Sequence, residues 1–385
     1  MPEVKPDIET FAKIKVVGVG GGGGSAINRM INSKIKGVEF LAVNTDVQAL
    51  HFSKANKKIN IGKQITRGLG AGMDPELGKK AAEENQNEIR ESLKDSDMVF
   101  ITCGLGGGTG SGGSPIVAQI ARDTGALTVA VVTKPFSFEG VQRKEISEKA
   151  YDALSQVVDA IITIPNDRIL QIVEKKTSLM DAFDIVDDVL RQGVQGISEL
   201  ITVPGQINVD FADVKKIMKE AGTALMGIGR GSGENRAIEA AKAAIQSPLL
   251  ETTIDGAKGI LFSITGSSDL GMNEVSEAAK IITQNADSDA RVIWGTVIDE
   301  SLKDEVKITV IATGFGGVKI SKQSQNASGF YPQPDFIKKS EPSSRPIKKE
   351  ESKKENFKVT EIRDDEENEE DVNELDIPAF LRKKM

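Results

Sequence analysis

The sequence is poor in the residues that build several common kinds of site. Among its 385 residues it has one cysteine and one histidine, and aromatic residues make up 4%. A disulfide within the chain needs two cysteines and a structural zinc site needs about four Cys or His ligands, so both are excluded. A Ser-His-Asp mechanism would have to use His51. The scarcity of aromatic rings argues against a platform that stacks single-stranded bases.

Excess positive charge and long apolar runs are also lacking. The net charge is −8, the wrong sign for a protein that neutralises many phosphates, and we expect no nucleic-acid partner. No apolar run reaches the roughly 18 residues of a spanning helix. The N-terminus has no apolar stretch of the kind found in secretory signals. We therefore expect a cytoplasmic protein that does not insert into a membrane.

Residues 13–180 alternate strand-like and helix-like segments. Strands separated by helices are typical of a Rossmann-like parallel sheet with helices on both faces, which binds ligands at the carboxyl ends of its strands. Each predicted strand ends in a polar or glycine-rich loop, so the site is expected there. The predicted strands are Lys13–Val19, Phe40–Val43, Asp97–Thr102, Leu127–Thr133 and Asp159–Ile164.

The rest of the chain divides by pattern and composition. Residues 181–203 predict a long central helix, because apolar residues recur there at helical spacing. Residues 204–317 predict a second, smaller α/β domain, so the fold class is α/β. Residues 318–374 are rich in charged and polar residues and predict a disordered linker, and an apolar cluster in residues 375–385 predicts a partner-binding peptide. Residues 1–12 are an N-terminal extension.

The first glycine-rich loop, Gly18–Ser25, lies between a predicted strand and a helical segment. Glycines let the backbone approach an anion, and the helix N-terminus adds partial positive charge. Gly18, Gly20 and Gly23 also satisfy the dinucleotide pattern G-x-G-x-x-G, with Asp46 as a candidate ribose acceptor. An NAD-dependent oxidoreductase is therefore one alternative.

The second glycine-rich loop, Gly104–Gly113, also follows a strand and opens a helix, which is expected to begin near Pro115. Two such loops could grip a di- or triphosphate from two sides. Neither loop has the lysine of G-x-x-x-x-G-K-[ST], so neither is a P-loop. Charge neutralisation would then come from N–H groups, helix dipoles and Mg²⁺.

A pair of aspartates, Asp210 and Asp213, lies at the start of a predicted helix. Residues three apart share a helix face, and paired carboxylates can orient a water molecule or hold a metal. Aspartate at a helix start is also a common N-cap, and from spacing alone capping is the favoured interpretation.

Residues Gly106–Gly112 read G-G-G-T-G-S-G and resemble the tubulin signature G-G-G-T-G-[ST]-G. Together with the two loops and the aspartate pair, the chain from about residue 13 to 317 resembles the tubulin/FtsZ family, whose bacterial cell-division members are GTPases. The terminal Asp376–Leu381 segment also matches. Further matching stretches are Asn44–Asp46, Gly68–Gly72, Lys134–Phe136, Phe138–Gly140, Ile164–Asp167 and Asn208–Asp213.

The resemblance implies that residues 13–180 bind GTP or GDP, with the phosphates between the two loops. It assigns the ribose to Glu139 and Arg143 and the guanine to Asn166, Phe183 and Asp187. The remaining implied contacts are Gly21, Gly22, Gly23, Gly24, Ser25, Asn44, Ala71, Gly72, Gly107, Gly108, Thr109 and Gly110. It implies no metal ligand among the side chains, so Mg²⁺ would be held through the nucleotide phosphates.

The base assignment has a physical basis. Phe183 and Asp187 are four residues apart on the predicted central helix and therefore share a face. The ring can stack on the base, and the carboxylate can accept from the N1–H and 2-amino groups of guanine. Adenine has no donor at N1, so the carboxylate would be left unpaired.

The resemblance also gives the aspartates a role. Asn208, Asp210 and Asp213 match a catalytic loop that acts on the nucleotide of the neighbouring subunit. Hydrolysis would then depend on head-to-tail self-assembly, a heterologous contact that extends into a filament. A GTP-binding regulator that never polymerises is the other alternative.

The family's cellular role gives the remaining expectations. The protein would organise the division ring at mid-cell beneath the inner membrane, and residues 375–385 would bind membrane tethers and division regulators. One departure is Ser25, which stands where the family usually has asparagine. Serine keeps a donor but is shorter, so the contact at this position is in question while the activity is not.

Overall fold

A computed structural model of the chain describes residues 12–171, 177–203, 205, 207, 209–250, 253–284 and 286–315. The strands in this part are β1 (Ile14–Val19), β2 (Val38–Asn44), β3 (Lys57–Asn60), β4 (Met98–Gly104), β5 (Leu127–Lys134), β6 (Ala160–Pro165), β7 (Gly222–Ser232), β8 (Gly259–Gly266), β9 (Arg291–Ile298) and β10 (Glu305–Thr313).

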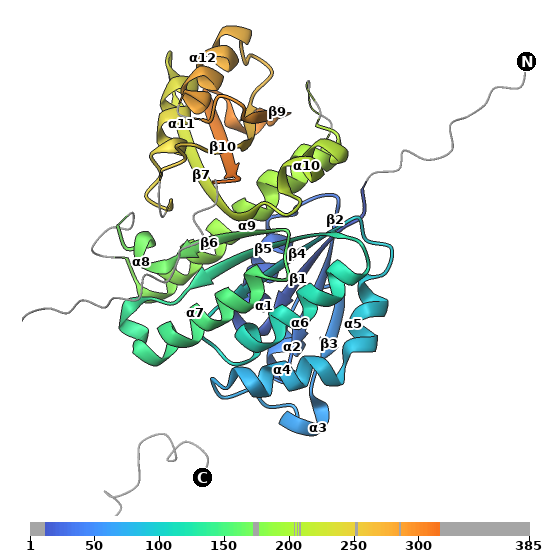
Figure 1. The fold of residues 1–385 in the computed structure, drawn as a ribbon. Helices are drawn as coiled ribbons and strands as arrows, with labels where there is room; N and C mark the ends of the chain where they lie inside the picture. The colour runs from blue at the N-terminus through green and yellow to red at the C-terminus, as the bar shows by residue number, and fades with distance from the viewer. Residues whose placement is uncertain are drawn as a thin grey trace, which may run out of the picture. The chain divides into compact units, whose positions relative to one another are not determined.

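The α-helices of the same residues lie between these strands in the sequence, singly or in runs of three (Figure 1). They are α1 (Gly20–Asn32), α2 (Val47–Phe52), α3 (Lys63–Thr66), α4 (Pro75–Glu84), α5 (Gln86–Leu93), α6 (Thr109–Asp123), α7 (Val141–Ser155), α8 (Asn166–Ile169), α9 (Leu179–Thr202), α10 (Phe211–Met218), α11 (Arg236–Ile245) and α12 (Met272–Thr283). Two short 3₁₀ helices cover Ser137–Glu139 and Glu300–Leu302.

The first seven strands form a parallel array in the order β3-β2-β1-β4-β5-β6-β7. Alternate residues of its central strands face two separate hydrophobic clusters. Val16 and Phe100 pack with α1 and α9, whereas Val17 and Ile101 pack with α4, α5, α6 and α7. The strands are therefore buried on both faces, which explains why they are continuous apolar runs in the sequence. The prediction of a parallel sheet with helices on both faces is confirmed.

The C-terminal half continues the sheet with β10, β8 and β9 beyond β7. β10 is antiparallel to both β7 and β8, and β9 is parallel to β8. A third hydrophobic cluster lies between these strands and helices α11 and α12. β7 belongs to both halves, since residues 222–224 pair with β6 and residues 225–232 pair with β10. The expected second α/β unit is present.

The structure differs from the prediction at β7. The helix predicted to start at Asp210 and Asp213 is α10, which ends at Met218, and a strand that the sequence pattern does not predict begins at Gly222. Glycine is a poor strand former, which hides this strand in the sequence. A Cβ at Gly227, Gly229 or Gly231 would lie 2.0 or 2.1 Å from a carbonyl oxygen of α11. The alternating glycines therefore let the backbone of α11 rest directly on the strand.

The two helices that follow the glycine loops begin earlier than predicted. α1 begins at Gly20 rather than after Ser25, and α6 begins at Thr109 rather than at Pro115. Glycine lowers helix propensity, so the pattern alone placed both starts too late. The predicted central helix is confirmed as α9. The predicted linker and terminal peptide, residues 318–374 and 375–385, lie outside the described residues.

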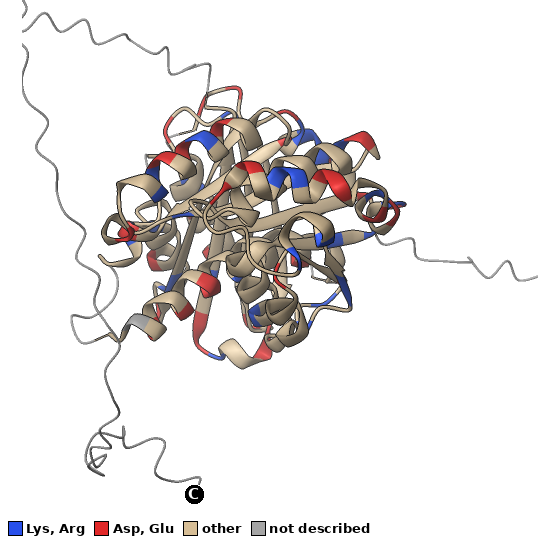
Figure 2. Ribbon diagram, turned by 90° about the horizontal axis from the view of Figure 1, so that it is seen from below, with Lys and Arg blue, Asp and Glu red and all other residues tan. Residues whose placement is uncertain are grey.

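Two further observations concern the surface and the membrane. Lys and Arg are interspersed with Asp and Glu over the described ribbon (Figure 2). Among the described residues, no helix combines the length and the apolar character needed to cross a bilayer.

Candidate functional site

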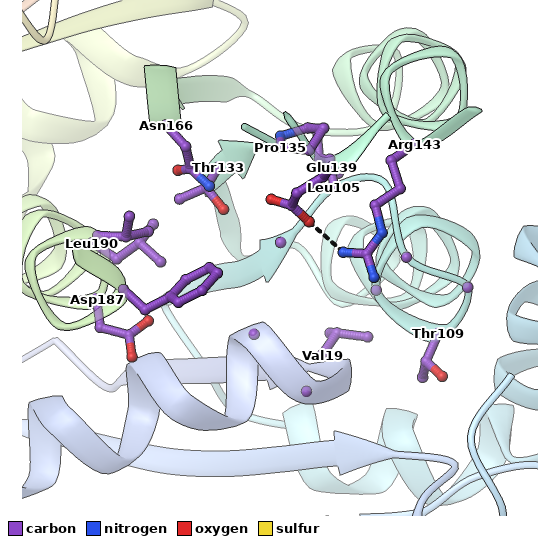
Figure 3. Close-up of a pocket in the computed structure, with 18 of the residues that line it drawn as sticks. Val19, Leu105, Thr109, Thr133, Pro135, Glu139, Arg143, Asn166, Asp187 and Leu190 are labelled. Atoms are coloured by element: carbon purple, nitrogen blue, oxygen red, sulfur yellow. Dashed lines mark hydrogen bonds and ion pairs between the residues drawn. The ribbon is translucent and has the colours of Figure 1, made fainter. Parts of the chain in front are cut away.

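A cavity of about 320 Å³ opens at the carboxyl ends of the central strands and is closed on one side by the first turns of α9. Its walls come from segments far apart in the sequence (Figure 3). The lining residues are Val19, Gly21, Gly22, Ala71, Gly104, Leu105, Gly107, Gly108, Thr109, Gly110, Thr133, Pro135, Glu139, Arg143, Asn166, Phe183, Val186, Asp187 and Leu190.

Backbone atoms of the two glycine loops form one end of this cavity. Gly20 opens α1 with φ +72°, and Gly106 turns the second loop with φ +102°, a conformation that favours glycine. A Cβ at Gly108 would lie 2.8 Å from the Cβ of Ala71 and 2.9 Å from the Asp74 nitrogen. α1 and α6 both begin at this end of the cavity. The first N–H groups of each helix have no partner within the helix, and each helix dipole adds partial positive charge, so both N-termini favour a bound anion.

Two hydroxyl contacts fix the second loop. The Oγ1 atoms of Thr45 and Thr109 lie 2.8 Å apart and are buried, which ties the end of β2 to the first residue of α6. The Gly106 N–H donates to Ser111 Oγ at 2.9 Å, which closes the loop on itself. The loop is thus held by contacts within the chain itself.

Glu139 and Arg143 form the next part of the wall, where Arg143 donates from Nη1 to Glu139 Oε2 (Figure 3). The other oxygen, Oε1, accepts from the Phe136 backbone N–H at 3.0 Å. The side chain of Glu139 is 15% exposed, so this carboxylate is held in a fixed place at the cavity edge.

Asn166, Phe183 and Asp187 form the end of the cavity away from the glycine loops. Asn166 Oδ1 is buried and has no hydrogen-bond partner among the described residues. Burial raises the pKa of Asp187 to about 6, against an opposing effect from Arg29 on α1 and a smaller reinforcing effect from Asp184. An orphaned amide oxygen and a desolvated carboxyl beside an aromatic ring are suited to a planar ligand that carries hydrogen-bond donors.

The predicted catalytic aspartates do not line this cavity. Asp210 caps α10, accepting from the Ala212 N–H at 3.1 Å, so the capping interpretation of this residue is correct. Asp213 is exposed and pairs with Lys216 at 3.4 Å. Phe183 and Asp187 lie in the first turns of α9, whereas α10 follows its far end, and the rise from residue 187 to 202 alone is about 22 Å. Asn208 lies outside the described residues.

Two family models match the chain. The GTPase domain of the tubulin/FtsZ family matches residues 13–174, and the C-terminal domain of the FtsZ family matches residues 222–316. The chain belongs to the tubulin/FtsZ family. It is therefore a GTPase of that family. Most residues that line the cavity lie in the segment that matches the GTPase domain, and the others belong to α9.

Solved structures agree with this membership. An empty FtsZ dimer from M. jannaschii is 47% identical, with a TM-score of 0.77 over 81% of this chain and 90% of that one. CetZ2 from Haloferax volcanii, solved as a GTPγS-bound protofilament, is 21% identical, with a TM-score of 0.66 over 78% and 92%. CetZ1 from the same organism, a GDP-bound monomer, is 22% identical, with a TM-score of 0.70 over 80% and 96%. At this identity the CetZ structures support the fold alone.

Family membership removes the dehydrogenase alternative. In the structure, Asp46 caps α2 and accepts from the N–H groups of Gln48 and Ala49 at 2.8 and 3.2 Å. Its carboxylate thus already satisfies a helix N-terminus, so it is poorly placed to accept from a ribose.

Twelve of the seventeen predicted nucleotide-binding residues line the cavity, and five do not. Gly23 is buried, and a Cβ there would lie 2.4 Å from the Thr102 carbonyl oxygen, so it allows α1 to pack closely on β4. Gly24, Ser25 and Asn44 line a neighbouring cavity between α1 and α2. Gly72 is exposed beside Ala71, with φ +56°. Nucleotide contacts remain predictions at all seventeen positions.

Seven lining residues were not predicted as ligand contacts: Val19, Gly104, Leu105, Thr133, Pro135, Val186 and Leu190. Thr133 and Pro135 follow from the rule that sites lie at strand ends, since both stand at the end of β5. Val186 and Leu190 lie three and seven residues after Phe183 and share its helix face. Helical spacing could have found them.

Proposed function

We propose that this GTPase hydrolyses GTP at head-to-tail contacts between copies of the chain, so that turnover depends on self-assembly. The observation that carries the proposal is the separation of the two halves of the machinery. The nucleotide cavity lies at the first turns of α9, and the exposed Asp210 and Asp213 follow its other end. A heterologous contact would bring one copy's aspartates to the next copy's cavity.

The residues of the cavity fit a guanine nucleotide. Loop N–H groups and Thr109 would hold the phosphates, and Glu139 would accept from a ribose hydroxyl. Phe183 would stack on the base, and ionised Asp187 would accept from the N1–H and 2-amino groups. Adenine would leave that buried carboxylate unpaired, which gives selectivity for guanine.

Within the described residues, no cluster of three or more acidic, His or Cys side chains could hold a metal. Mg²⁺ is therefore proposed to bind through the phosphate oxygens, where it would neutralise charge that the loops, which lack a P-loop lysine, leave in place.

The aspartates would act on water. In the assembled state Asp210 and Asp213 would accept hydrogen bonds from the attacking water and align it with the γ-phosphorus, while the bond to the β–γ bridging oxygen breaks. Asn208 is proposed to act in the same loop. Both carboxylates are exposed in the single chain, so they remain available to a second copy.

The cellular role follows from the family. The chain is proposed to form protofilaments that build the division ring at mid-cell in the cytoplasm, beneath the inner membrane. The proposed domains are the GTP-binding domain 13–180, the central helix 181–203 and the C-terminal domain 204–317. Residues 318–374 would act as a spacer, and residues 375–385 would bind membrane tethers and division regulators.

The decisive experiment measures GTP turnover per subunit against protein concentration in Mg²⁺, with ATP as the control nucleotide. Turnover should be low in dilute protein and rise past a threshold with GTP only. Asp213→Ala should abolish the rise and keep GTP binding. The matched control is Asp123→Ala, which removes another surface ion pair, with Arg90 at 3.6 Å, and should behave as wild type. Turnover independent of concentration would favour a site complete in one chain.

The role of the terminal peptide has a separate test. Deleting residues 376–385 should leave the concentration dependence of turnover unchanged, because the proposed interface uses the folded part of the chain. A loss of assembly in the truncated chain would contradict the proposal that only the folded part of the chain forms the interface.

A further inference from the structure

The segment between β5 and α7 contains a buried residue that touches both the sugar side and the base side of the cavity wall without lining it. Phe136 is 1% exposed and does not line the cavity. Its backbone N–H donates to Glu139 Oε1 at 3.0 Å. Its ring meets the Phe183 ring edge-to-face, with centroids 5.6 Å apart and an interplanar angle of 81°.

A third ring completes this arrangement. Phe138 stacks on Phe136 with centroids 4.9 Å apart and an interplanar angle of 14°. Phe138 is 62% exposed and Phe183 is 40% exposed, so the fully buried ring lies between two rings that reach the surface. Offset-stacked and edge-to-face pairs are the favourable aromatic geometries, which fixes the orientation of the central ring.

We propose that Phe136 is a positioning residue that couples recognition of the sugar to recognition of the base. The proposal rests on the proposed guanine-nucleotide site. Through its backbone Phe136 orients the Glu139 carboxylate, and through its ring it orients Phe183. The Arg143–Glu139 contact alone does not fix the carboxylate, because the Arg143 side chain is itself 40% exposed. The buried ring also anchors the backbone that carries this N–H, so replacing the ring should displace both the Glu139 carboxylate and Phe183 and alter two recognition steps together.

A purely structural role makes a different prediction. If Phe136 only fills the core, its replacement lowers stability and weakens all nucleotides equally. If it positions both side chains, its replacement reduces the preference for the correct base and the preference for the complete ribose. The ratio of two affinities separates the cases, because a general loss of folded protein cancels in the ratio.

The test measures the affinities of the full chain for GTP, ITP and dideoxy-GTP by equilibrium competition at a protein concentration below the assembly threshold. ITP lacks the 2-amino group, so the GTP/ITP ratio reports how well the base is seated on Asp187, which depends on the position of the stacked Phe183 ring. Dideoxy-GTP lacks the ribose hydroxyls and reports sugar recognition. In Phe136→Leu we expect both the GTP/ITP and the GTP/dideoxy-GTP affinity ratios to fall by about threefold or more. Phe100→Leu is the matched control, since Phe100 is also fully buried in the same cluster but in β4, and both ratios should be unchanged.

Two comparison variants sharpen the test. Phe183→Leu should lower the first ratio only, and Glu139→Gln the second only, because each touches one part of the nucleotide. Phe138→Ala removes the exposed ring that stacks on Phe136 and replaces Phe136→Leu in the test if that variant fails to fold. In Phe138→Ala both affinity ratios should fall together, by less than in Phe136→Leu. Unchanged ratios, or a fall in only one of them, in Phe136→Leu or in Phe138→Ala used in its place would overturn the coupling. A wild-type chain that binds no GTP, or does not distinguish it from ITP, would instead overturn the proposed function.

Discussion

The nucleotide cavity and the aspartate pair differ in how far the single chain completes them. The cavity is made largely of backbone and buried side chains, with Thr109 8% and Asn166 5% exposed. Asp210 and Asp213 are exposed. The first caps its own helix, and the second forms a surface ion pair with Lys216. Folding alone builds the first site, whereas in the proposed mechanism the second acquires a reaction partner only from another copy.

The difference teaches where substitutions should act. In the cavity, binding and folding use the same atoms, so a change that disturbs one disturbs the other. At the start of α10 the fold needs only a cap at Asp210, and Asp213 contributes a solvent-screened ion pair of small value. Substitutions there should lower GTP turnover with little effect on stability.

The largest expected effect comes from mixing two inactive chains. Asp213→Ala keeps its cavity and Asp187→Ala keeps its aspartates, and each alone should lose roughly a hundredfold or more in turnover. In an equimolar mixture about a quarter of random head-to-tail contacts pair an intact cavity with an intact aspartate loop. Turnover measured in the mixture should recover to a comparable fraction of wild type. Recovery no greater than the sum of the two separate activities would place both groups in one chain.

The next largest effect is expected where the second glycine-rich loop packs against Ala71 and Asp74. Gly108→Ala would force a Cβ to within 3 Å of Ala71 and Asp74, and we expect GTP affinity to fall about tenfold or more with a lower melting temperature. Gly70→Ala is the matched control, since a Cβ there meets nothing within 4 Å and Gly70 is neither a predicted nucleotide contact nor part of the cavity wall. Calorimetric titration and thermal melts measure both quantities. Equal losses in the two variants would show that the cavity does not depend on this close packing.

A smaller effect is the pH dependence of GTP binding. The pKa of Asp187 is raised to about 6 in the empty chain, and the proposed contact requires the ionised carboxylate. Affinity should therefore be constant well above pH 6 and fall by up to about tenfold per unit below it, with one proton released on binding. Asp187→Asn should bind more weakly at neutral pH and lose this dependence.

The same variant has a predicted effect on stability. A carboxyl whose pKa is raised by folding opposes folding once it ionises, so the stability of the empty chain should fall as pH rises from about 4 to about 6. Asp187→Asn should remove that loss, and thermal melts without nucleotide across this pH range would detect it. A variant less stable than wild type at neutral pH would contradict the assignment.

The smallest effect is expected at Lys216. The pair with Asp213 spans 3.4 Å between exposed side chains, so Lys216→Ala should change stability by less than about 1 kcal/mol. Turnover should stay within about threefold of wild type, because Asp213 would exchange one weak partner for water. A large loss of turnover with intact folding would assign the lysine itself to the interface.

Strand periodicity predicted the parallel sheet and its ligand-binding edge, because strands buried on both faces are continuous apolar runs. It could not predict β7, whose alternating glycines serve a packing contact with α11 that only the tertiary structure reveals. Two glycine loops indicated the candidate site in outline, and the proposed ribose and base contacts rest on family resemblance. Phe136 could not be found this way, because its role depends on ring contacts across more than forty residues of sequence, to Phe183.

The shared strand β7 limits how the chain can be divided. The matched GTPase segment ends at residue 174, before β7 begins at Gly222. A fragment cut there would leave the backbone of Ala160–Ile162 without its partners at Gly222–Ala224 and turn β6 into an open edge. Open edges recruit strands from other molecules. For experiments on this protein, the smallest useful unit is therefore set by hydrogen bonding across β6 and β7 rather than by the boundary of the enzymatic domain.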